Sequence, residues 1–263
     1  MAENVRVVTV DATNVEQERF FCYKSKPRTE GYRSKLTWLH DRFAEGMKVK
    51  ILYEGKRSVG FIEYMPGEMA WRAAEAPNYL LIHCLWVVGK GKGKGYGSQL
   101  ISLCMADARE LGKRGVAVVA SSGNWLANDK VFLRNGFQKV DAAPPEFTLL
   151  AYALGVGDGP DPRFPTDWEA RAQAFGSGAT IPYADQCPYM LDAVAGAVKA
   201  FEDRGIPART VKLTDAARVR ATAPSPYGVF SIVLDGKLFC YHYLGRRELR
   251  QLDELVAERS TRR

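Results

Sequence analysis

The sequence predicts a mixed α/β (α+β) protein in two parts: an N-terminal part of residues 1–154 and a smaller C-terminal part of residues 166–263. Three observations predict it. Short apolar, β-branched runs are interspersed with patterns of helical spacing. A glycine- and lysine-rich loop joins one apolar run to an amphipathic helix. Residues 155–165, GVGDGPDPRFP, break both helix and strand, so we predict a linker there.

In the N-terminal part, β-branched and aromatic runs predict strands, and apolar residues near helical spacing predict helices. The predicted strands are residues 5–10, 49–53, 59–64, 79–88, 116–120 and 147–153. The predicted helices are residues 32–45, 98–113 and 128–135. The strands 49–53 and 59–64 should form a hairpin around Glu54-Gly55-Lys56, and Gly136 should stop the third helix.

The C-terminal part begins with a predicted strand, residues 179–184, which Pro182 should keep at a sheet edge or make irregular. A helix should follow with Pro188 at its first position. That would place Cys187 at the N-cap, where the helix dipole would lower the pKa of its thiol. The remaining predicted elements are a strand at 211–213, a hairpin of 229–234 and 238–243 around Asp235-Gly236, and a helix at 247–257.

The formal charge of the 263-residue chain is +7, which can attract nucleic acid or a polyanionic cofactor. No basic run has interleaved aromatic residues, so we expect no nucleic-acid partner. No uncharged apolar run reaches about 18 residues, so we expect no membrane span. The first residues lack a basic flank followed by an apolar stretch, so a cytoplasmic location is the default expectation.

The chain has five cysteines, an odd number at irregular spacings. This pattern is neither a disulfide framework nor a zinc motif, so we expect free thiols and no metal site.

The most informative segment is the loop GKGKGKGYG, residues 89–97, between the strand 79–88 and the helix 98–113. Its glycines allow tight turns that direct backbone N–H groups inward, and the helix adds its positive dipole end. Together they predict an anion site suited to a pyrophosphate, with added charge from Lys90, Lys92 and Lys94.

Other readings of this loop are weaker. A dinucleotide-binding fold needs an acidic residue about 20 residues further on, and the next strand ends in Ser-Ser-Gly without one. A Walker loop needs Gly-Lys-Ser/Thr, whereas Ser98 directly follows Gly97. A surface loop without a ligand stays open as an alternative.

The stretch Lys92-Gly93-Lys94-Gly95-Tyr96-Gly97 resembles the coenzyme A motif Gln/Arg-x-x-Gly-x-Gly/Ala of the GNAT superfamily of acetyltransferases. Lysine replaces the first residue of the motif but keeps its charge. Residues 132–137, FLRNGF, resemble the family's Tyr-x-Lys-x-Gly-Phe signature. The resemblance covers about 150 residues and implies a GNAT fold with acetyl-CoA as the cofactor. The cofactor-binding residues that it implies are Trp86, Val87, Val88, Lys92, Gly93, Lys94, Gly95, Tyr96, Gly97, Ser98, Asn124 and Phe132.

Acetyl transfer to an amine benefits from a general base, which this family commonly places on the strand before the phosphate loop. His83 is the good base there. It stands four residues before Val87, similar to the His-x-His-Ala-Leu-x-Val strand of arylalkylamine acetyltransferases. The alternative is a buried histidine that a backbone partner satisfies.

Phe132 occupies the position of the usual proton donor to the thiolate and cannot donate a proton. Tyr96 or water would then take that role. Glu63 is a further catalytic candidate. The substrate-binding candidates are Glu68, Trp71, Arg72 and Cys187, and solvated loop charges are the alternative for Glu63, Glu68 and Arg72.

The C-terminal order of strand, Cys-Pro-Tyr, helix, strand, proline, hairpin and helix resembles the thioredoxin/glutaredoxin fold. Met190 replaces the second cysteine of glutaredoxins, so dithiol oxidoreduction is not expected. Pro226 is the candidate for that fold's cis-proline. The whole order resembles acetyltransferases with a C-terminal YoaP-like domain. Cys187 then has a monothiol, a substrate-binding or a structural role.

The sequence therefore predicts an acetyl-CoA-dependent N-acetyltransferase that acts on a small-molecule amine. Two alternatives remain: a thiol-handling or redox-responsive protein whose GNAT domain senses acyl-CoA, and a binding module without turnover. A homodimer stays open.

Overall fold

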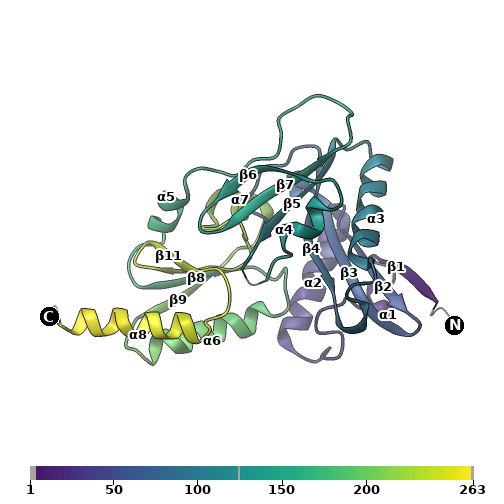
Figure 1. Cartoon of the computed structure of the whole chain (residues 1–263). Coiled ribbons are helices and arrows are strands. Elements are labelled where there is room, and N and C mark those ends of the chain that lie inside the picture. The colour runs from purple at the N-terminus through teal and green to yellow at the C-terminus, as the bar shows by residue number, and fades with distance from the viewer. Residues whose placement is uncertain (1–3, 124, 262–263) are drawn as a thin grey trace.

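The computed structural model describes residues 4–123 and 125–261 of the chain, and its strands form two sheets. A seven-stranded sheet has the order β1-β2-β3-β4-β5-β7-β6, and a four-stranded sheet has the order β11-β10-β8-β9. The strands are β1 (Val5–Val10), β2 (Lys48–Glu54), β3 (Arg57–Pro66), β4 (Tyr79–Val87), β5 (Gly115–Ser121), β6 (Gln138–Ala143), β7 (Phe147–Ala153), β8 (Ala179–Tyr183), β9 (Ala208–Lys212), β10 (Ile232–Leu234) and β11 (Lys237–Cys240). The chain ends lie at opposite sides of the molecule (Figure 1).

The helices are α1 (Val15–Glu18), α2 (Glu30–Ala44), α3 (Tyr96–Glu110), α4 (Asp129–Leu133), α5 (Trp168–Gln173), α6 (Met190–Glu202), α7 (Ala216–Thr222) and α8 (Arg246–Thr261). None of the helices in the described part of the chain is long and apolar enough to cross a membrane.

Every predicted strand and helix has a counterpart at nearly the predicted position, which confirms those predictions. The elements α1, β6, α5 and α7 have no predicted counterpart. The three helices have four to seven residues, too few for a helical period to show. The exposed strand β6 has the sequence QKVDAA, which lacks an apolar alternation.

Two C-terminal predictions were wrong. Strand β8 lies between β10 and β9, not at an edge. It tolerates Pro182 because β10 pairs only with Ala179 and Thr180, so the missing N–H lies beyond that ladder. The cis peptide bond in the described residues precedes Pro145, not Pro226.

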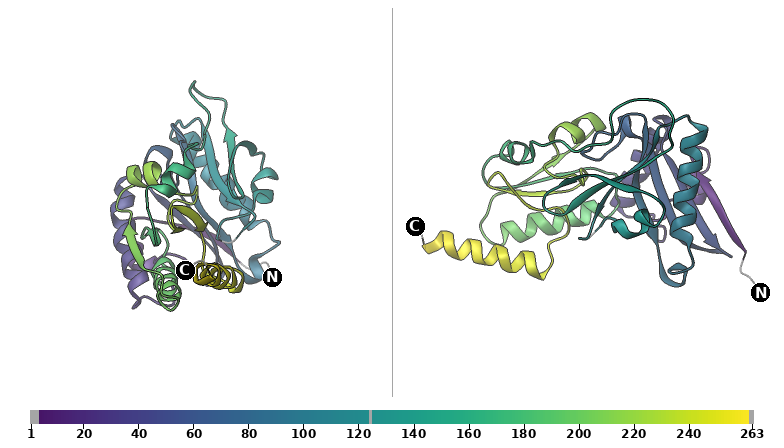
Figure 2. Two further views of the ribbon diagram at one scale, coloured as in Figure 1. Left: turned by 90° about the vertical axis from the view of Figure 1, so that its left-hand side faces the viewer. Right: turned by 45° about the horizontal axis from the view of Figure 1, so that its top comes forward.

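The two faces of the seven-stranded sheet carry separate cores. Alternate side chains of β3 and β4, such as Ile62 and Leu80, pack under α3 and α4. The opposite side chains, such as Phe61 and Leu81, join a larger buried cluster that continues through α2 into the four-stranded sheet. Figure 2 shows α3 on the outer side of the sheet and the C-terminal elements on the other.

The C-terminal part packs closely against the N-terminal part. The Ala73 N–H donates to the Pro226 carbonyl at 3.3 Å, and residues 75 and 163 form an isolated β-bridge. A Cβ built at Gly31 of α2 would lie 2.1 Å from the Pro188 carbonyl oxygen. The position of the domain boundary stays a prediction, but the two parts share one continuous core.

Strand β4 has two irregularities. It pairs with the parallel strand β5 only from Tyr79 to Ile82, so the strands separate beyond that point. Against β3 the register shifts, since Glu63 lies opposite Cys84 while Tyr64 lies opposite Ile82. The extra residue is His83. Such a bulge re-aims side chains, and here it gives His83 and Cys84 the same face of the sheet.

Candidate functional site

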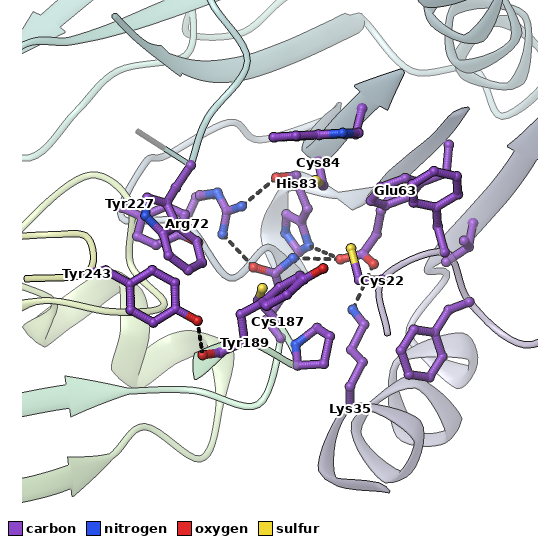
Figure 3. A pocket seen from close by; sticks show the side chains of 18 of the residues that line it. Cys22, Lys35, Glu63, Arg72, His83, Cys84, Cys187, Tyr189, Tyr227 and Tyr243 are labelled. Carbon is purple, nitrogen blue, oxygen red and sulfur yellow. Dashed lines mark hydrogen bonds and ion pairs between the residues drawn. The ribbon is translucent and has the colours of Figure 1, made fainter. Parts of the chain in front are cut away.

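A cavity of about 600 Å³ lies where β3 and β4 meet α2 and the C-terminal part. Its volume is in the range of small-molecule pockets. Its walls are mostly apolar and rich in aromatic rings, with thiols and a few polar groups. The lining residues are Phe20, Phe21, Cys22, Lys35, Val49, Phe61, Glu63, Arg72, His83, Cys84, Trp86, Val88, Trp125, Gln186, Cys187, Pro188, Tyr189, Tyr227, Tyr243, Gly245 and Glu248. Figure 3 shows how these side chains converge from both parts of the chain.

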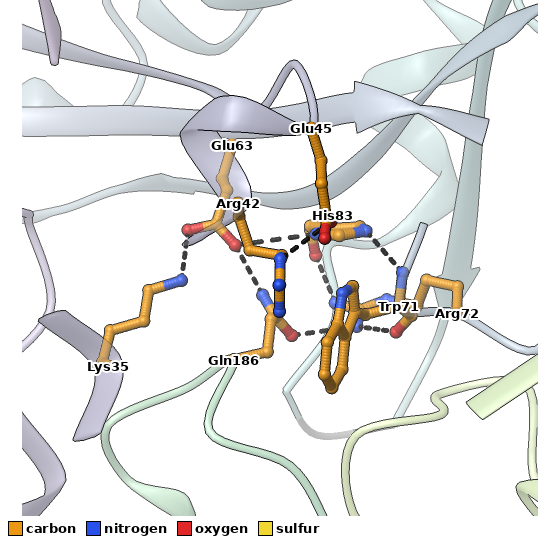
Figure 4. A network of polar contacts seen from close by, with 8 residues as sticks. All are labelled: Lys35, Arg42, Glu45, Glu63, Trp71, Arg72, His83 and Gln186. Atoms are coloured by element: carbon orange, nitrogen blue, oxygen red, sulfur yellow. Dashed lines mark hydrogen bonds and ion pairs between the residues drawn. The ribbon is translucent and has the colours of Figure 1, made fainter. Parts of the chain in front are cut away.

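The cavity floor is a connected network of buried polar side chains (Figure 4). The Glu63 carboxylate accepts from the Lys35 ammonium at 2.7 Å and from the Gln186 amide at 2.7 Å. The Gln186 carbonyl in turn accepts from the Arg72 guanidinium at 2.9 Å. Gln186 therefore ties a carboxylate and a guanidinium of the N-terminal part to the C-terminal part.

Glu63 is ionised in this network. Burial acts to raise the pKa of its carboxyl, but the Lys35 ammonium and the His83 ring outweigh burial and lower that pKa to about 2. Glu63 is 3 % exposed and so is Lys35. Removing either charge would leave the other uncompensated inside the protein, which is strongly destabilising.

His83 is a neutral hydrogen-bond acceptor in this arrangement. Its Nε2 accepts from the Trp71 backbone N–H at 3.0 Å, so the ring proton is on Nδ1. Nδ1 lies 3.7 Å from the nearer Glu63 oxygen, too far for a good hydrogen bond, and is buried without a partner among the described residues. Burial lowers the pKa of His83 to about 4, against the raising effect of Glu63. Its lone pair is therefore occupied, as the alternative of a backbone-satisfied histidine expects.

Arg72 is 2 % exposed and, among the residues that the structure describes, donates only to neutral oxygens. They are the Trp71 carbonyl, the Gln186 side chain and the His83 carbonyl. Its Nε is buried without a partner among the described residues. Burial lowers the pKa of the guanidinium, which remains far above neutrality because an arginine starts so high.

Three thiols line the cavity: Cys22, Cys84 and Cys187. Burial raises the pKa of Cys84 to about 12 and that of Cys187 to about 11, and it raises the pKa of Cys22 well above its usual value. The predicted N-cap position of Cys187 was wrong, because α6 begins at Met190 with Tyr189 as its N-cap. Cys187 therefore sits before the helix in an apolar wall, and the predicted lowering of its pKa is reversed.

The predicted phosphate loop lies between β4 and α3. Gly93 and Gly95 have φ values of 81° and 80°, a region that side chains rarely adopt. A Cβ at either would meet no atom within 4 Å, so the space above them is open. Gly95 is the N-cap of α3, and no side chain caps the helix there. These features suit an anion bound by backbone N–H groups.

Other predicted site residues lie outside the cavity lining. The Tyr96 hydroxyl donates to Glu54 at 2.6 Å. Phe132 is fully buried beside Phe137 on the α3 side of the sheet. The Glu68 carboxylate accepts from the Asn78 N–H at 2.6 Å.

Among the remaining cofactor candidates, Trp86 and Val88 line the cavity, and Trp86 is 47 % exposed. Asn124 lies outside the described residues. Val87 packs against the core on the α3 side, and Ser98 accepts from Asn135 at 3.0 Å.

Most residues of the cavity lining are not predicted from the sequence. Lys35 falls in a helical pattern as an ordinary surface lysine would, and Tyr227 and Tyr243 belong to the C-terminal part, far from β4 in the sequence. Gln186 had one available signal, its place beside the Cys-Pro-Tyr sequence. The others depend on long-range packing.

Comparisons with known proteins agree on the N-terminal part. Residues 12–137 match the model of the acetyltransferase (GNAT) family. An uncharacterised N-acetyltransferase of Bacillus subtilis strain 168, YoaP, is 28 % identical over 255 residues, which cover 95 % of this chain and 99 % of that protein.

Solved structures resemble the chain more distantly. An acetyltransferase from Thermus thermophilus is 16 % identical with a TM-score of 0.41, over 58 % of this chain and 99 % of that one. A GNAT-family acetyltransferase from Brucella melitensis, in complex with acetyl-CoA, is 17 % identical with a TM-score of 0.38, over 60 % of this chain and 93 % of that one.

Proposed function

We propose that this chain, an acyltransferase that uses acetyl-CoA, acetylates the amine of a small molecule; its residues 12–137 match the acetyltransferase (GNAT) family. The observation that carries the proposal is the cavity of about 600 Å³ beside the separated ends of β4 and β5. Its volume suits a small ligand, and its walls come from both parts of the chain.

For the acetyl donor, we propose that the loop Lys92–Gly97 and the N-terminus of α3 hold the pyrophosphate of coenzyme A. The open space above Gly93 and Gly95 supports this assignment. Beyond Ile82, strand β4 has no pairing with β5, so its backbone groups at that edge can accept the amide groups of the pantetheine arm. Trp86 and Val88 then lie where that edge meets the cavity.

For proton transfer, we propose Glu63 as the acceptor of the amine proton and His83 as a positioning residue. The Glu63 carboxylate lines the cavity, whereas the Nε2 lone pair of His83 is used by Trp71. His83 holds the Trp71–Arg72 backbone and flanks the carboxylate. A low pKa makes Glu63 a weak base. The amine nitrogen therefore bonds to the acetyl carbon first, which makes its N–H acidic, and then gives its proton to Glu63.

The leaving thiolate needs a proton donor. Phe132 has no acidic proton to give, and the Tyr96 hydroxyl already donates its hydrogen bond to Glu54. We propose that solvent returns to the sulfur the proton lost by the nitrogen. The products are then the acetamide and the coenzyme A thiol.

We also propose that the C-terminal part is a thioredoxin-like domain whose Cys-Pro-Tyr loop has become a wall of the acceptor cavity. The strand order β11-β10-β8-β9, with β8 and β9 parallel, supports this fold. Cys187 and Tyr189 both line the cavity.

One observation favours the alternative of thiol chemistry, since three thiols face one cavity. The raised pKa of Cys187 and of Cys84 weighs against it, because the thiolate is the reactive form.

The central test is turnover of acetyl-CoA with a panel of small amines, measured by mass spectrometry of the acetylated product. Glu63→Gln should lower kcat by about 100-fold, while acetyl-CoA affinity by calorimetry stays unchanged. An absence of acetylation across a broad amine panel, with acetyl-CoA bound, would favour a sensing module.

A matched pair of variants separates the two roles of His83. In His83→Gln, the side-chain oxygen of the glutamine can still accept from the Trp71 N–H, whereas the alanine of His83→Ala offers no acceptor. A positioning residue predicts that Gln keeps most of the turnover that Ala loses. Equal, deep losses in both variants would make His83 the base itself.

A further inference from the structure

The charges at the cavity floor do not cancel. Lys35, Glu63 and Arg72 are ionised and nearly fully buried, while His83 is neutral because its Nε2 accepts from a backbone N–H. At the floor, two cations therefore face one carboxylate. The thiols and phenols of the lining are neutral near pH 7. The second lining carboxylate, Glu248, is only half-buried at the start of α8, where it accepts from the Gly245 N–H at 2.9 Å.

The uncompensated charge belongs to Arg72. The Lys35 ammonium contacts Glu63 directly at 2.7 Å, whereas Arg72 reaches that carboxylate only through the Gln186 amide. A guanidinium has more N–H groups than the neutral oxygens around Arg72 use, and its Nε has no partner among the described residues. A buried cation without an anion costs free energy that a bound anion would offset.

A second polar group faces the same place. Tyr227 is 3 % exposed and lines the cavity, and its ring lies 5.0 Å from the Arg72 guanidinium carbon. Its hydroxyl makes no hydrogen bond to any residue that the structure describes. Figure 3 shows Tyr227 and Arg72 side by side.

This pair is held rigidly. The neighbouring residues in the chain, Pro226 and Ala73, are joined by a hydrogen bond, in which the Pro226 carbonyl accepts from the Ala73 N–H at 3.3 Å. A Cβ at Gly228 would lie 3.1 Å from the Arg72 Cα, so the two backbones are in close contact. Binding an anion there needs little reorganisation, which favours affinity.

We propose that Arg72 and Tyr227 form a subsite for a carboxylate of the acceptor, so that the acceptor is an apolar amine that also carries a carboxylate group. The inference rests on the proposed acetylation and adds the substrate class. The carboxylate supplies the missing negative charge, the aromatic walls cover the apolar body, and the amine points toward Glu63 and the β4 edge.

The test compares matched amines with and without a carboxylate: phenylalanine against phenethylamine, and tryptophan against tryptamine. We expect kcat/KM to be at least about 100-fold higher for the member with the carboxylate, because its loss leaves buried donors unpaired. Tyr227→Phe should reduce that ratio by about 10-fold, and Arg72→Gln should abolish it. Tyr152→Phe is the control, since that ring packs against Phe137 on the α3 side of the sheet, outside the cavity lining, and it should leave the ratio unchanged.

A second readout does not depend on turnover. 3-Phenylpropionate should raise the melting temperature of the wild type more than neutral 3-phenylpropanol does, and Tyr227→Phe should shrink that difference. Equal turnover of both members of each pair would overturn the subsite and leave the acetylation intact. Tyr227-dependent stabilisation by the carboxylate, without acetylation of any amine, would support the subsite and overturn the proposed function.

Discussion

The phosphate loop and the acceptor cavity adjoin the same strand, β4, yet they are built from different materials. The loop is contiguous in sequence and presents backbone N–H groups, with glycines at φ 81° and 80°. The cavity collects side chains from residues 20 to 248 and depends on two parts of the chain meeting. The proposed donor site therefore depends on local conformation, whereas the proposed acceptor site depends on long-range packing.

The largest effect should come from breaking the loop alone. In Gly95→Asp, a carboxylate enters the open space at the N-cap of α3 and the φ of 80° becomes strained. Acetyl-CoA affinity should fall by about 100-fold or more, since the change adds repulsion to a lost backbone geometry. Gly112→Asp is the control, because Gly112 has a φ of 61° and similar open space at the other end of α3. An equal loss in both variants, by calorimetry, would locate the pyrophosphate elsewhere.

The next effect comes from breaking the cavity without touching the loop. Gln186→Ala removes one buried donor from the Glu63 carboxylate and one buried acceptor from the Arg72 guanidinium, which leaves Glu63 with Lys35 and Arg72 with two backbone carbonyls. The free energy of unfolding should fall by about 3 kcal/mol, and acetyl-CoA affinity should stay unchanged in the folded protein. Gln251→Ala, on the exposed face of α8, should cost less than about 0.5 kcal/mol. Urea unfolding of both variants measures the difference, and similar small losses would mean that the network adds little stability.

Acid should destabilise the cavity, because His83 and Glu63, two groups whose pKa is shifted by folding, lie there. The pKa of His83 is lowered from 6.5 to about 4, so the unfolded chain binds a proton that the folded one does not, and stability falls as the pH drops through that window. The pKa of Glu63 is lowered from 4.5 to about 2, so its stabilisation is complete above pH 4.5 and is lost as the pH falls toward 2. Urea unfolding across this pH range should show both losses in sequence.

Two variants assign these losses. His83→Gln should flatten the dependence between pH 6.5 and 4, and Glu63→Gln the dependence between 4.5 and 2. His40→Gln changes a histidine whose side chain is 41 % exposed, and should leave both windows as in the wild type. A wild-type stability that stays constant from pH 7 to 4 would contradict the burial of a neutral His83.

The smallest effect concerns Cys187. Burial raises the pKa of its thiol to about 11, so little thiolate exists at neutral pH. We expect alkylation in the folded protein to be slower than that of the same cysteine in urea-unfolded chain, by peptide mass analysis. Cys187→Ser should leave acetyl-CoA affinity unchanged. Preferential, rapid labelling of Cys187 would instead support the alternative function, in which this thiol is reactive.

The same contrast explains how far prediction from sequence reached. The strand, loop and helix around Gly95 are predictable because a few adjacent glycines and lysines determine the conformation and charge of the loop. The family match over residues 12–137 confirms the GNAT resemblance. The sequence predicts His83 and Glu63 as site residues, but it does not predict their hydrogen bonds. The bond from Trp71 to His83 depends on the bulge in β4, and the bond from Gln186 to Glu63 depends on how the C-terminal part packs.

Cys187 shows the opposite limit. A proline at the next position favours a helix start there, but the chain makes one further turn and α6 begins at Met190. The tertiary contact of this turn with α2 at Gly31 overrides the local preference. Burial then reverses the expected electrostatics, and no sequence pattern near Cys187 encodes that burial.

The fit at Gly31 has a consequence for how such a chain can be inherited. Any side chain there would collide with the Pro188 carbonyl, and one at Gly228 would press on the backbone of Trp71. An N-terminal part with any side chain at position 31, or a C-terminal part with one at position 228, would push the two parts away from each other and deform the cavity between them. We therefore expect a change of acceptor to be reached more readily by point mutations on both sides of this contact than by exchange of either part.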